Sequence, residues 1–195
     1  MKIGLFFGSF NPIHVGHMVL TNYMLAYTDL DQVWFVVSPH NPLKKKSSLL
    51  HERHRIQLVT LAIGDNPKLK ASDIEFGLPQ PSYTVNTLVH LRERYPQLNF
   101  VLIMGEDNLQ SFHKWKNYEE ILQQHDLYIY PRFDKMPETG KAAVLQHPRV
   151  RRISAPLVEI SSTAIRQAIR EKKDMRYFMP QPVWDYIKEM HFYEK

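Results

Sequence analysis

The sequence contains no cysteine and only 7 glycines among its 195 residues. The absence of cysteine excludes disulfide frameworks, cysteine-ligated zinc, iron–sulfur clusters and a thiol nucleophile. No apolar run reaches the roughly 18 residues that a membrane-spanning helix needs, and the apolar stretch Met1–Phe7 is too short for a secretory signal. We therefore expect a cytoplasmic protein that does not associate with membranes.

Two glycine-rich nucleotide signatures are also missing. The chain has no GxxxxGK[ST] motif, which excludes a P-loop, and no GxGxxG motif, which counts against a dinucleotide-binding dehydrogenase. The segment His51–Arg55 comes near the metal-binding HExxH pattern, but Arg55 stands where the second histidine ligand would be. The sequence therefore predicts no protein-ligated metal.

The composition that remains is typical of a globular protein. Hydrophobic residues make up 44% and charged residues 23% of the chain, and the length fits a single domain over residues 1–195. Lys and Arg exceed Asp and Glu by 25 to 20, a net charge of +5. This mild excess suits an anionic small molecule at least as well as a nucleic acid.

Short apolar runs alternate with longer amphipathic stretches. Buried strands typically read as continuous apolar runs, whereas surface helices repeat apolar residues at i, i+3 and i+4. Alternation of the two predicts an α/β fold, a parallel sheet with helices on both faces, whose ligand site lies beyond the carboxyl ends of the strands. The predicted strands are Ile3–Phe7, Val33–Val37, Phe100–Met104 and Leu127–Tyr130, and the predicted helices are His14–Tyr27, His51–Ile63, Ser82–Tyr95, Tyr118–Gln124, Ser162–Glu171 and Val183–Met190.

The segment Gly8–His17 follows the first predicted strand and opens a helix. His14 and His17 are three residues apart, so both imidazoles can face the same point above the strand end. Gly16 between them leaves room for a close ligand approach, and the helix start adds positive potential. The pattern indicates a phosphate site, although two separate capping histidines would also give it.

The segment Ile160–Arg166 carries consecutive hydroxyls at a predicted helix N-terminus. Ser161, Ser162 and Thr163 could cap free backbone amides, which is the common role of such residues. They could equally present hydroxyls to a phosphate chain, with Arg166 one turn further on as a charged clamp.

Three other segments offer groups that suit parts of a nucleotide. Asp107 follows a predicted strand and could bind ribose hydroxyls, or could belong to a turn bonded to its own backbone. Lys44 in a run of three lysines could reach a triphosphate or stay solvated. Tyr83, Thr84 and Trp115 offer aromatic faces and a hydroxyl for a heteroaromatic ring, or serve packing alone.

The two phosphate motifs together match a known pattern. GSFNPIHVGH near the N-terminus and ISSTAIR near the C-terminus resemble the HxGH nucleotidyltransferases, which have a Rossmann-like fold. More narrowly, the chain resembles bacterial nicotinate-nucleotide adenylyltransferases over almost its full length. That resemblance includes PSYTVNTL, MGEDN, FHKWKNYEEIL and RYFMPQPVWDYI.

The resemblance implies a reaction of ATP with nicotinate mononucleotide, with Mg²⁺ bridging ATP oxygens, that gives nicotinate adenine dinucleotide and pyrophosphate in NAD biosynthesis. It also implies a role for each matching residue. The expected catalytic residues are His14, His17 and Arg166; the expected ATP-binding residues are Gly8, Ser9, Phe10, Gly16, Asp107, Ser162 and Thr163; the expected mononucleotide-binding residues are Asn11, Lys44, Tyr83, Thr84 and Trp115.

Other functions remain open on the sequence alone. The same chemistry could act on nicotinamide mononucleotide or phosphopantetheine. A nucleotide- or RNA-binding module without catalysis would also fit a basic chain with many aromatics, but the basic residues are dispersed, so we expect no nucleic-acid partner. A homo-oligomer is compatible with the sequence.

Overall fold

The chain alternates strands and helices along its length, as the sequence predicts. The computed structural model describes residues 1–39, 49–132 and 142–195. Its strands are β1 (Lys2–Gly8), β2 (Gln32–Val37), β3 (Leu69–Ser72), β4 (Asn99–Gly105), β5 (Asp126–Tyr130) and β6 (Val150–Arg152). Its helices are α1 (Val15–Tyr27), α2 (Glu52–Ile63), α3 (Thr84–Arg94), α4 (Leu109–Phe112), α5 (Tyr118–Gln124), α6 (Ala142–Leu145), α7 (Ser162–Arg170) and α8 (Gln181–Glu189), with short 3₁₀ helices at Ile74–Gly77, Glu106–Asn108 and Arg176–Phe178.

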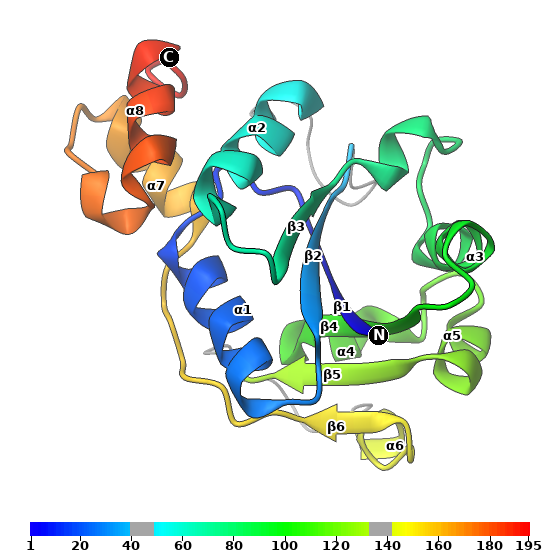
Figure 1. Ribbon diagram of the computed structural model, residues 1–195. Coiled ribbons are helices and arrows are strands. Elements are labelled where there is room, and N and C mark those ends of the chain that lie inside the picture. Colours follow the sequence, from blue (N-terminus) through cyan, green and yellow to red (C-terminus); the bar gives the residue numbers. More distant parts are fainter. Residues whose placement is uncertain (40–48, 133–141) are drawn as a thin grey trace.

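The strands form one parallel sheet. Its 6 strands lie in the order β3-β2-β1-β4-β5-β6, and every neighbouring pair is parallel. This is the Rossmann-type order, in which the chain leaves β1 in one direction for β2 and in the other for β4. Ligands bind such sheets at the carboxyl ends of the two strands where the order reverses. The fold therefore predicts a ligand site at the residues that follow Gly8 and Gly105 (Figure 1).

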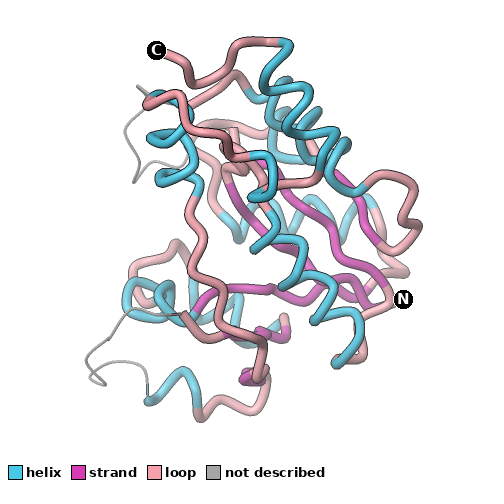
Figure 2. Tube along the Cα trace, turned by 90° about the vertical axis from the view of Figure 1, so that its left-hand side faces the viewer, coloured by secondary structure: helices cyan, strands magenta, loops and turns pink. Residues whose placement is uncertain are grey.

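Helices cover both faces of the sheet (Figures 1 and 2). One core packs α1, α2, α7 and α8 against residues such as Phe6, Phe35 and Ile103. The other core packs α3, α4 and α5 against Leu5 and Leu102. Because both faces are buried, the central strands are apolar throughout, which is why their sequences read as continuous hydrophobic runs.

The two outer strands do not have that signature. β3 has only 4 residues and includes the exposed Lys70, and β6 has 3 residues and includes the exposed Arg151 and Arg152. The sequence pattern predicted neither strand. Short edge strands with charged side chains protect a sheet from pairing with other chains, but they carry too few apolar residues to be recognised.

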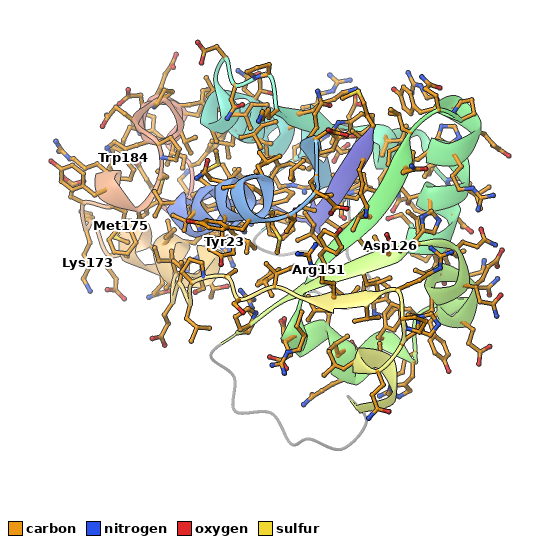
Figure 3. All side chains as sticks on the ribbon, turned by 60° about the horizontal axis from the view of Figure 1, so that its bottom comes forward. Tyr23, Asp126, Arg151, Lys173, Met175 and Trp184 are labelled. Atoms are coloured by element: carbon orange, nitrogen blue, oxygen red, sulfur yellow. The ribbon has the colours of Figure 1, made fainter. Side chains whose placement is uncertain are left out.

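Charged side chains join the amino ends of the strands. Lys2 Nζ lies 2.8 Å from Asp29 Oδ2 and 3.2 Å from Asp126 Oδ2, which ties β1 to β5. Figure 3 shows Asp126 and Arg151 on this side of the sheet, while Met175 and Trp184 lie on the side of α7 and α8. Within the described ranges, no helix is both long and apolar enough to span a membrane.

Candidate active site

The turn after β1 is built around a buried phenylalanine. Phe10 has a positive φ of 44° and is only 2% exposed. Its ring lies against Gly8, where an added Cβ would come within 2.8 Å of the ring. The ring of Phe10 therefore belongs to the core and is not available to a ligand.

The second motif holds this turn directly. Arg166 Nη1 donates to the carbonyl of Asn11 at 2.8 Å, and Ser162 Oγ donates to the carbonyl of Pro12 at 2.8 Å. Arg166 Nη2 also donates to Thr163 Oγ1 at 3.3 Å. Two segments about 150 residues apart in the chain thus meet at one point, as the pairing of the motifs predicts.

The N-cap of α7 is Ser161, the first of the three consecutive hydroxyl residues. Ser161 Oγ accepts a hydrogen bond from the backbone N–H of Ala164 at 3.1 Å. The capping role considered for these hydroxyls is therefore confirmed for Ser161. The hydroxyl of Ser162 instead points back to the β1 turn.

The two imidazoles lie face to face at the start of α1. The ring centroids of His14 and His17 are 3.7 Å apart, with an angle of 32° between the planes. His14 is the N-cap, so the helix begins one residue later than predicted, and its backbone N–H donates to His17 Nδ1 at 3.2 Å. A Cβ on Gly16 would lie 3.0 Å from His14 Nδ1, so the glycine provides the space for this ring.

His14 is buried and lacks a hydrogen-bond partner on one nitrogen. The residue is 5% exposed, and its Nδ1 has no partner among the described residues. Burial, with a smaller contribution from the charge of Arg132, lowers the pKa of His14 to about 4. His14 is therefore neutral near pH 7 and can donate or accept a hydrogen bond without carrying charge. A buried polar atom without a partner is the kind of group that a ligand satisfies.

An acidic side chain that follows β4 lies beside a basic one that follows β5. Asp107 Oδ1 lies 3.5 Å from Arg132 Nε, and Asn108 Nδ2 donates to the same oxygen at 3.3 Å. The missing side chain of Gly105 leaves room for the Asp107 carboxylate. Asn108 Nδ2 also donates to the carbonyl of Gly105 at 3.4 Å, which is the turn interaction considered for this segment, and the role of Asp107 toward a ribose stays a prediction.

Arg132 was missed by the sequence analysis. It follows β5 by two residues and influences both Asp107 and His14 electrostatically. The strand-end rule used for the other segments would have found it, because it stands at the carboxyl end of a predicted strand.

Asn11 is fixed by residues far from it in the chain. It is 3% exposed, and its Oδ1 accepts from Tyr193 Oη at 2.8 Å and from the backbone N–H of Leu50 at 3.2 Å. The sequence analysis missed both partners, since nothing in their local sequence points to this contact.

The predicted ring-binding residues gather at a second place. Tyr83 is the N-cap of α3 and 39% exposed, and Lys116 Nζ lies 4.9 Å from the centroid of its ring. Trp115, next to that lysine, is half-buried with its ring 5.3 Å from that of Phe112. Thr84 is the first residue of α3. The contacts described here do not join this group to the β1 turn, and Lys44 lies outside the described residues.

The side chains of the site suit an anion such as phosphate. They are two imidazoles, hydroxyls and the guanidinium groups of Arg132 and Arg166. Among the described residues there is no group of 3 or more His, Asp or Glu side chains placed to hold a metal ion. Such an arrangement binds anions through charge-assisted hydrogen bonds.

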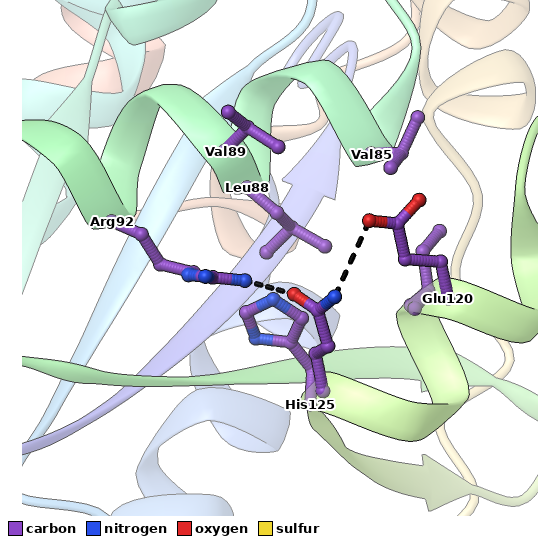
Figure 4. A pocket seen from close by; sticks show the side chains of 8 residues that line it. Val85, Leu88, Val89, Arg92, Glu120 and His125 are labelled. Carbon is purple, nitrogen blue, oxygen red and sulfur yellow. Dashed lines mark hydrogen bonds between the residues drawn. The ribbon is translucent and has the colours of Figure 1, made fainter.

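A hollow elsewhere in the molecule is too small for a substrate. It lies between α3 and α5, has a volume of about 10 Å³, and is lined by residues that include Val85, Leu88 and His125 (Figure 4). Gln124 of α5 accepts a hydrogen bond from Arg92 of α3, which links the two helices, and donates one to Glu120 of its own helix. The volume is room for one water molecule at most.

Comparison with known proteins agrees with this geometry. A family model described as cytidylyltransferase-like matches residues 5–168. The chain is 57% identical over 195 residues to a probable nicotinate-nucleotide adenylyltransferase of Flavobacterium johnsoniae, with 100% of each chain covered. It is 47% identical to a protein of the same description from Bacteroides thetaiotaomicron, covering 97% of this chain and 92% of the relative.

Solved structures share the fold. A Plasmodium falciparum nicotinic acid mononucleotide adenylyltransferase complexed with NaAD superposes with a TM-score of 0.80 at 20% identity, covering 99% of this chain and 97% of that one. A putative nicotinate-nucleotide adenylyltransferase from Vibrio parahaemolyticus gives 0.71 at 23% identity, covering 100% and 96%. With the family match and the high identity over the full length, the chain belongs to the nicotinate-nucleotide adenylyltransferase family, within the cytidylyltransferase-like group.

Proposed function

We propose that the protein transfers the adenylyl group of ATP to nicotinate mononucleotide, with nicotinate adenine dinucleotide and pyrophosphate as products. The observation that carries this proposal is the meeting of the two phosphate motifs on the turn after β1. There the stacked pair of His14 and His17 lies beside a segment held by Ser162 and Arg166. The full-length relatives at up to 57% identity support the same reaction, since they are described as nicotinate-nucleotide adenylyltransferases.

The reaction requires positioning and charge stabilisation but no general base. The 5′-phosphate of the mononucleotide is largely ionised near neutral pH, because the second pKa of a phosphate monoester is about 6. Its oxygen attacks the α-phosphorus of ATP in line, a new P–O bond forms, and the bond to the β-phosphate oxygen breaks. The electron pair leaves with pyrophosphate, so the enzyme has to align the groups and stabilise the negative charge.

The residues of the β1 turn fit this task. We assign His14 and His17 as hydrogen-bond donors to the phosphate groups, and the backbone amides of Ser9 and Phe10 as further donors. The neutral state of His14 allows its unpartnered nitrogen to bond to an oxygen without an ion pair. Donors that are fixed in advance at developing negative charge supply much of the rate enhancement of enzymes.

The α7 motif is assigned to the departing pyrophosphate. Arg166 uses Nη1 and Nη2 for its bonds to Asn11 and Thr163. A guanidinium has five N–H donors, so this side chain can hold the turn and an anion together. Mg²⁺ belongs to the substrate in this proposal, entering with ATP. It usually keeps several waters and binds through phosphate oxygens, so it needs few protein ligands.

The remaining assignments concern the two nucleosides. We place a ribose at Asp107 and the pyridine ring between Tyr83, Thr84 and Trp115. Lys44 and the side chain of Asn11 are assigned to the mononucleotide as well. Gly8 and Gly16 contribute by the space that their missing side chains leave.

Pyrophosphate release from ATP and Mg²⁺ tests the proposal. The acceptors to compare under identical conditions are nicotinate mononucleotide, nicotinamide mononucleotide and phosphopantetheine. We expect strong preference for the nicotinate substrate. Preference for either of the others would keep the phosphate chemistry and reject the substrate. No pyrophosphate release with any of the three acceptors would reject catalysis and favour a binding module.

A single substitution tests the assignment of His17. We expect His17→Ala to lower kcat roughly 10²–10³-fold, the usual loss for one donor to a developing negative charge, with little change in folding. His90→Ala, on α3 and outside the site, is the matched control and should keep wild-type kcat. Near-wild-type turnover of His17→Ala would contradict the role given to this residue.

A further inference from the structure

Arg55 is a fully buried arginine on α2. Its exposed fraction is 0%, and it is among the largest completely buried side chains of the protein. It shares the buried face of the helix with Leu58 and Val59, at the i+3 and i+4 positions. Arginine is almost never fully buried unless its charge is paired, so this placement needs an explanation.

The guanidinium bonds to backbone carbonyls of separate segments. Nε donates to Leu50 O at 2.8 Å, Nη1 to Ser9 O at 2.8 Å and to Ser38 O at 2.7 Å, and Nη2 to Pro39 O at 2.8 Å. Ser9 follows β1, Ser38 and Pro39 follow β2, and Leu50 precedes α2. One side chain therefore connects the carboxyl ends of two neighbouring strands at the candidate active site.

No carboxylate of the described residues forms an ion pair with Arg55. Glu52, on the same helix, lies 3.7 Å from His51 Nε2 instead. Burial lowers the pKa of Arg55, while the charge of Glu52 partly opposes that effect. A buried charge without an acidic partner destabilises a fold compared with an apolar side chain of similar volume. The arrangement is therefore poorly explained by stability alone.

The bond to Ser9 also sets the direction of the next amide. The Ser9–Phe10 peptide is trans, so its C=O and N–H point in opposite directions. With the Ser9 carbonyl directed to Arg55, the Phe10 N–H points away from α2. The bond from Ser162 to the Pro12 carbonyl directs the Ile13 N–H away from α7 in the same manner. Backbone amides turned outward by such a loop form sites for anions.

We propose that Arg55 is a positioning residue for adenylyl transfer: by holding the carbonyls of Ser9, Ser38 and Pro39, it aims the Phe10 amide at a phosphate and fixes the β1 and β2 ends relative to each other. This inference rests on the proposed function. Arg55 itself does not touch the substrate. Its effect on the reaction passes through the backbone of the two loops.

The kinetic test compares two substitutions with matched controls. Arg55→Lys keeps the charge but has three donors for four carbonyls, and Arg55→Met keeps the volume but has none. Arg53→Lys and Arg53→Met, at an exposed position on the same helix, are the controls. kcat and KM for both substrates are measured at a temperature well below the Tm of each variant.

We expect kcat to fall about 10-fold in Arg55→Lys and about 100-fold in Arg55→Met, since misplacing a catalytic group by about 1 Å costs about that much. KM for ATP should change far less, because the aligned donors matter most in the transition state. The Arg53 variants should keep wild-type values. A residue that only stabilised the fold would lower Tm and leave kcat of the folded protein unchanged, and that result would overturn the proposal.

A measurement on the wild-type protein covers the case in which the Arg55 variants do not fold. In a titration with pyrophosphate followed by ¹⁵N NMR, we expect the Phe10 amide resonance to shift together with that of His17. A shift at His17 without one at Phe10 would overturn the positioning role. If the wild type releases no pyrophosphate with any acceptor, the proposed function fails, while this titration still decides whether the Phe10 amide faces an anion.

Discussion

The buried, neutral His14 predicts a particular dependence of stability on pH. The pKa of this side chain is about 4 in the folded protein, compared with 6.5 for an ordinary histidine. When the pH falls below 6.5, the unfolded chain binds a proton at His14 and the folded chain does not. Protonation therefore favours the unfolded state, and the stability that is fully present above pH 6.5 is lost progressively down to about pH 4.

The size of the effect follows from the shift. Each pKa unit corresponds to about 1.4 kcal/mol. The difference between 6.5 and about 4 therefore amounts to about 3 kcal/mol in full, of which about 2 kcal/mol is lost between pH 6.5 and pH 5. Little solvent screening applies, because His14 is only 5% exposed. The charged and titratable groups that face it are Arg132 and His17.

Urea unfolding at several pH values, with wild type and His14→Gln compared, measures this contribution. Other buried groups also titrate: His125, whose pKa burial lowers, and Glu75, whose pKa burial raises. Both are present in the two proteins, so their effects cancel in the difference. We expect the free energy of unfolding to fall between pH 7.5 and pH 5 in both proteins. The fall should be about 2 kcal/mol larger in the wild type than in His14→Gln.

The control is Asn86→Gln, a substitution at an exposed, non-titrating position of α3 that should keep the wild-type dependence on pH. An identical slope in wild type and His14→Gln between pH 7.5 and pH 5 would refute the reasoning. It would mean that His14 takes up a proton in the folded protein as readily as in the unfolded chain, and that its ring is not the neutral donor assumed in the mechanism.

Three further substitutions test separate parts of the site. Gly16→Ala should leave stability nearly unchanged, because alanine's better helix propensity, up to about 1 kcal/mol, offsets the crowding of His14. It should lower kcat about 10-fold in the pyrophosphate assay, since the His14 ring must shift. An unchanged kcat would show that His14 tolerates the displacement. Tyr193→Phe should lower the free energy of unfolding by about 1 kcal/mol, which corresponds to a fall in Tm of about 2–4 °C, and should raise KM for the mononucleotide by releasing Asn11. Thermal unfolding and steady-state kinetics measure the two effects. Wild-type values of Tm and KM would show that the contact contributes to neither. Trp115→Ala should weaken mononucleotide binding in calorimetry and keep ATP affinity, whereas a loss of ATP affinity would mean that the two subsites are exchanged.

The sequence predicted the centre of the fold better than its edges. β1, β2, β4 and β5 were all expected within one residue at each end, because strands buried on both faces are apolar throughout. β3 and β6, at the edges, were not expected, since each has few residues and exposed charges. The helix Tyr118–Gln124 was predicted with its observed bounds and the other five predicted helices within two residues, whereas the short helices α4 and α6 were not expected.

Local spacing also predicted that the two imidazoles face the same point. Residues at i and i+3 share a helix face, and the rings of His14 and His17 are indeed in contact at 3.7 Å. The approach of α7 to the β1 turn followed from the pairing of motifs, and the bonds from Ser162 and Arg166 confirm the approach itself. The roles of these residues toward substrates stay predictions.

The long-range polar contacts could not be predicted from the sequence. Arg55 lies on the buried face of α2, one turn before the apolar residues Leu58 and Val59. A charged residue at such a position was the feature of the sequence that could have indicated its role. Glu75 gives no such signal, although it is 2% exposed and accepts from Thr87 Oγ1 at 2.7 Å and Ser82 Oγ at 3.3 Å. Contacts of this kind depend on tertiary geometry that no periodicity encodes.

The contact between Tyr193 and Asn11 bears on how the protein is made. The two residues are 182 positions apart, so the first loop of the chain leaves the ribosome long before the group that fixes it. At about 5–20 residues per second, the delay is roughly 10–40 s. During that time a nascent chain has its first strand but no completed site. The β1 turn therefore gains this hydrogen bond only after residue 193 has been synthesised, and a fragment that ends earlier holds Asn11 without it.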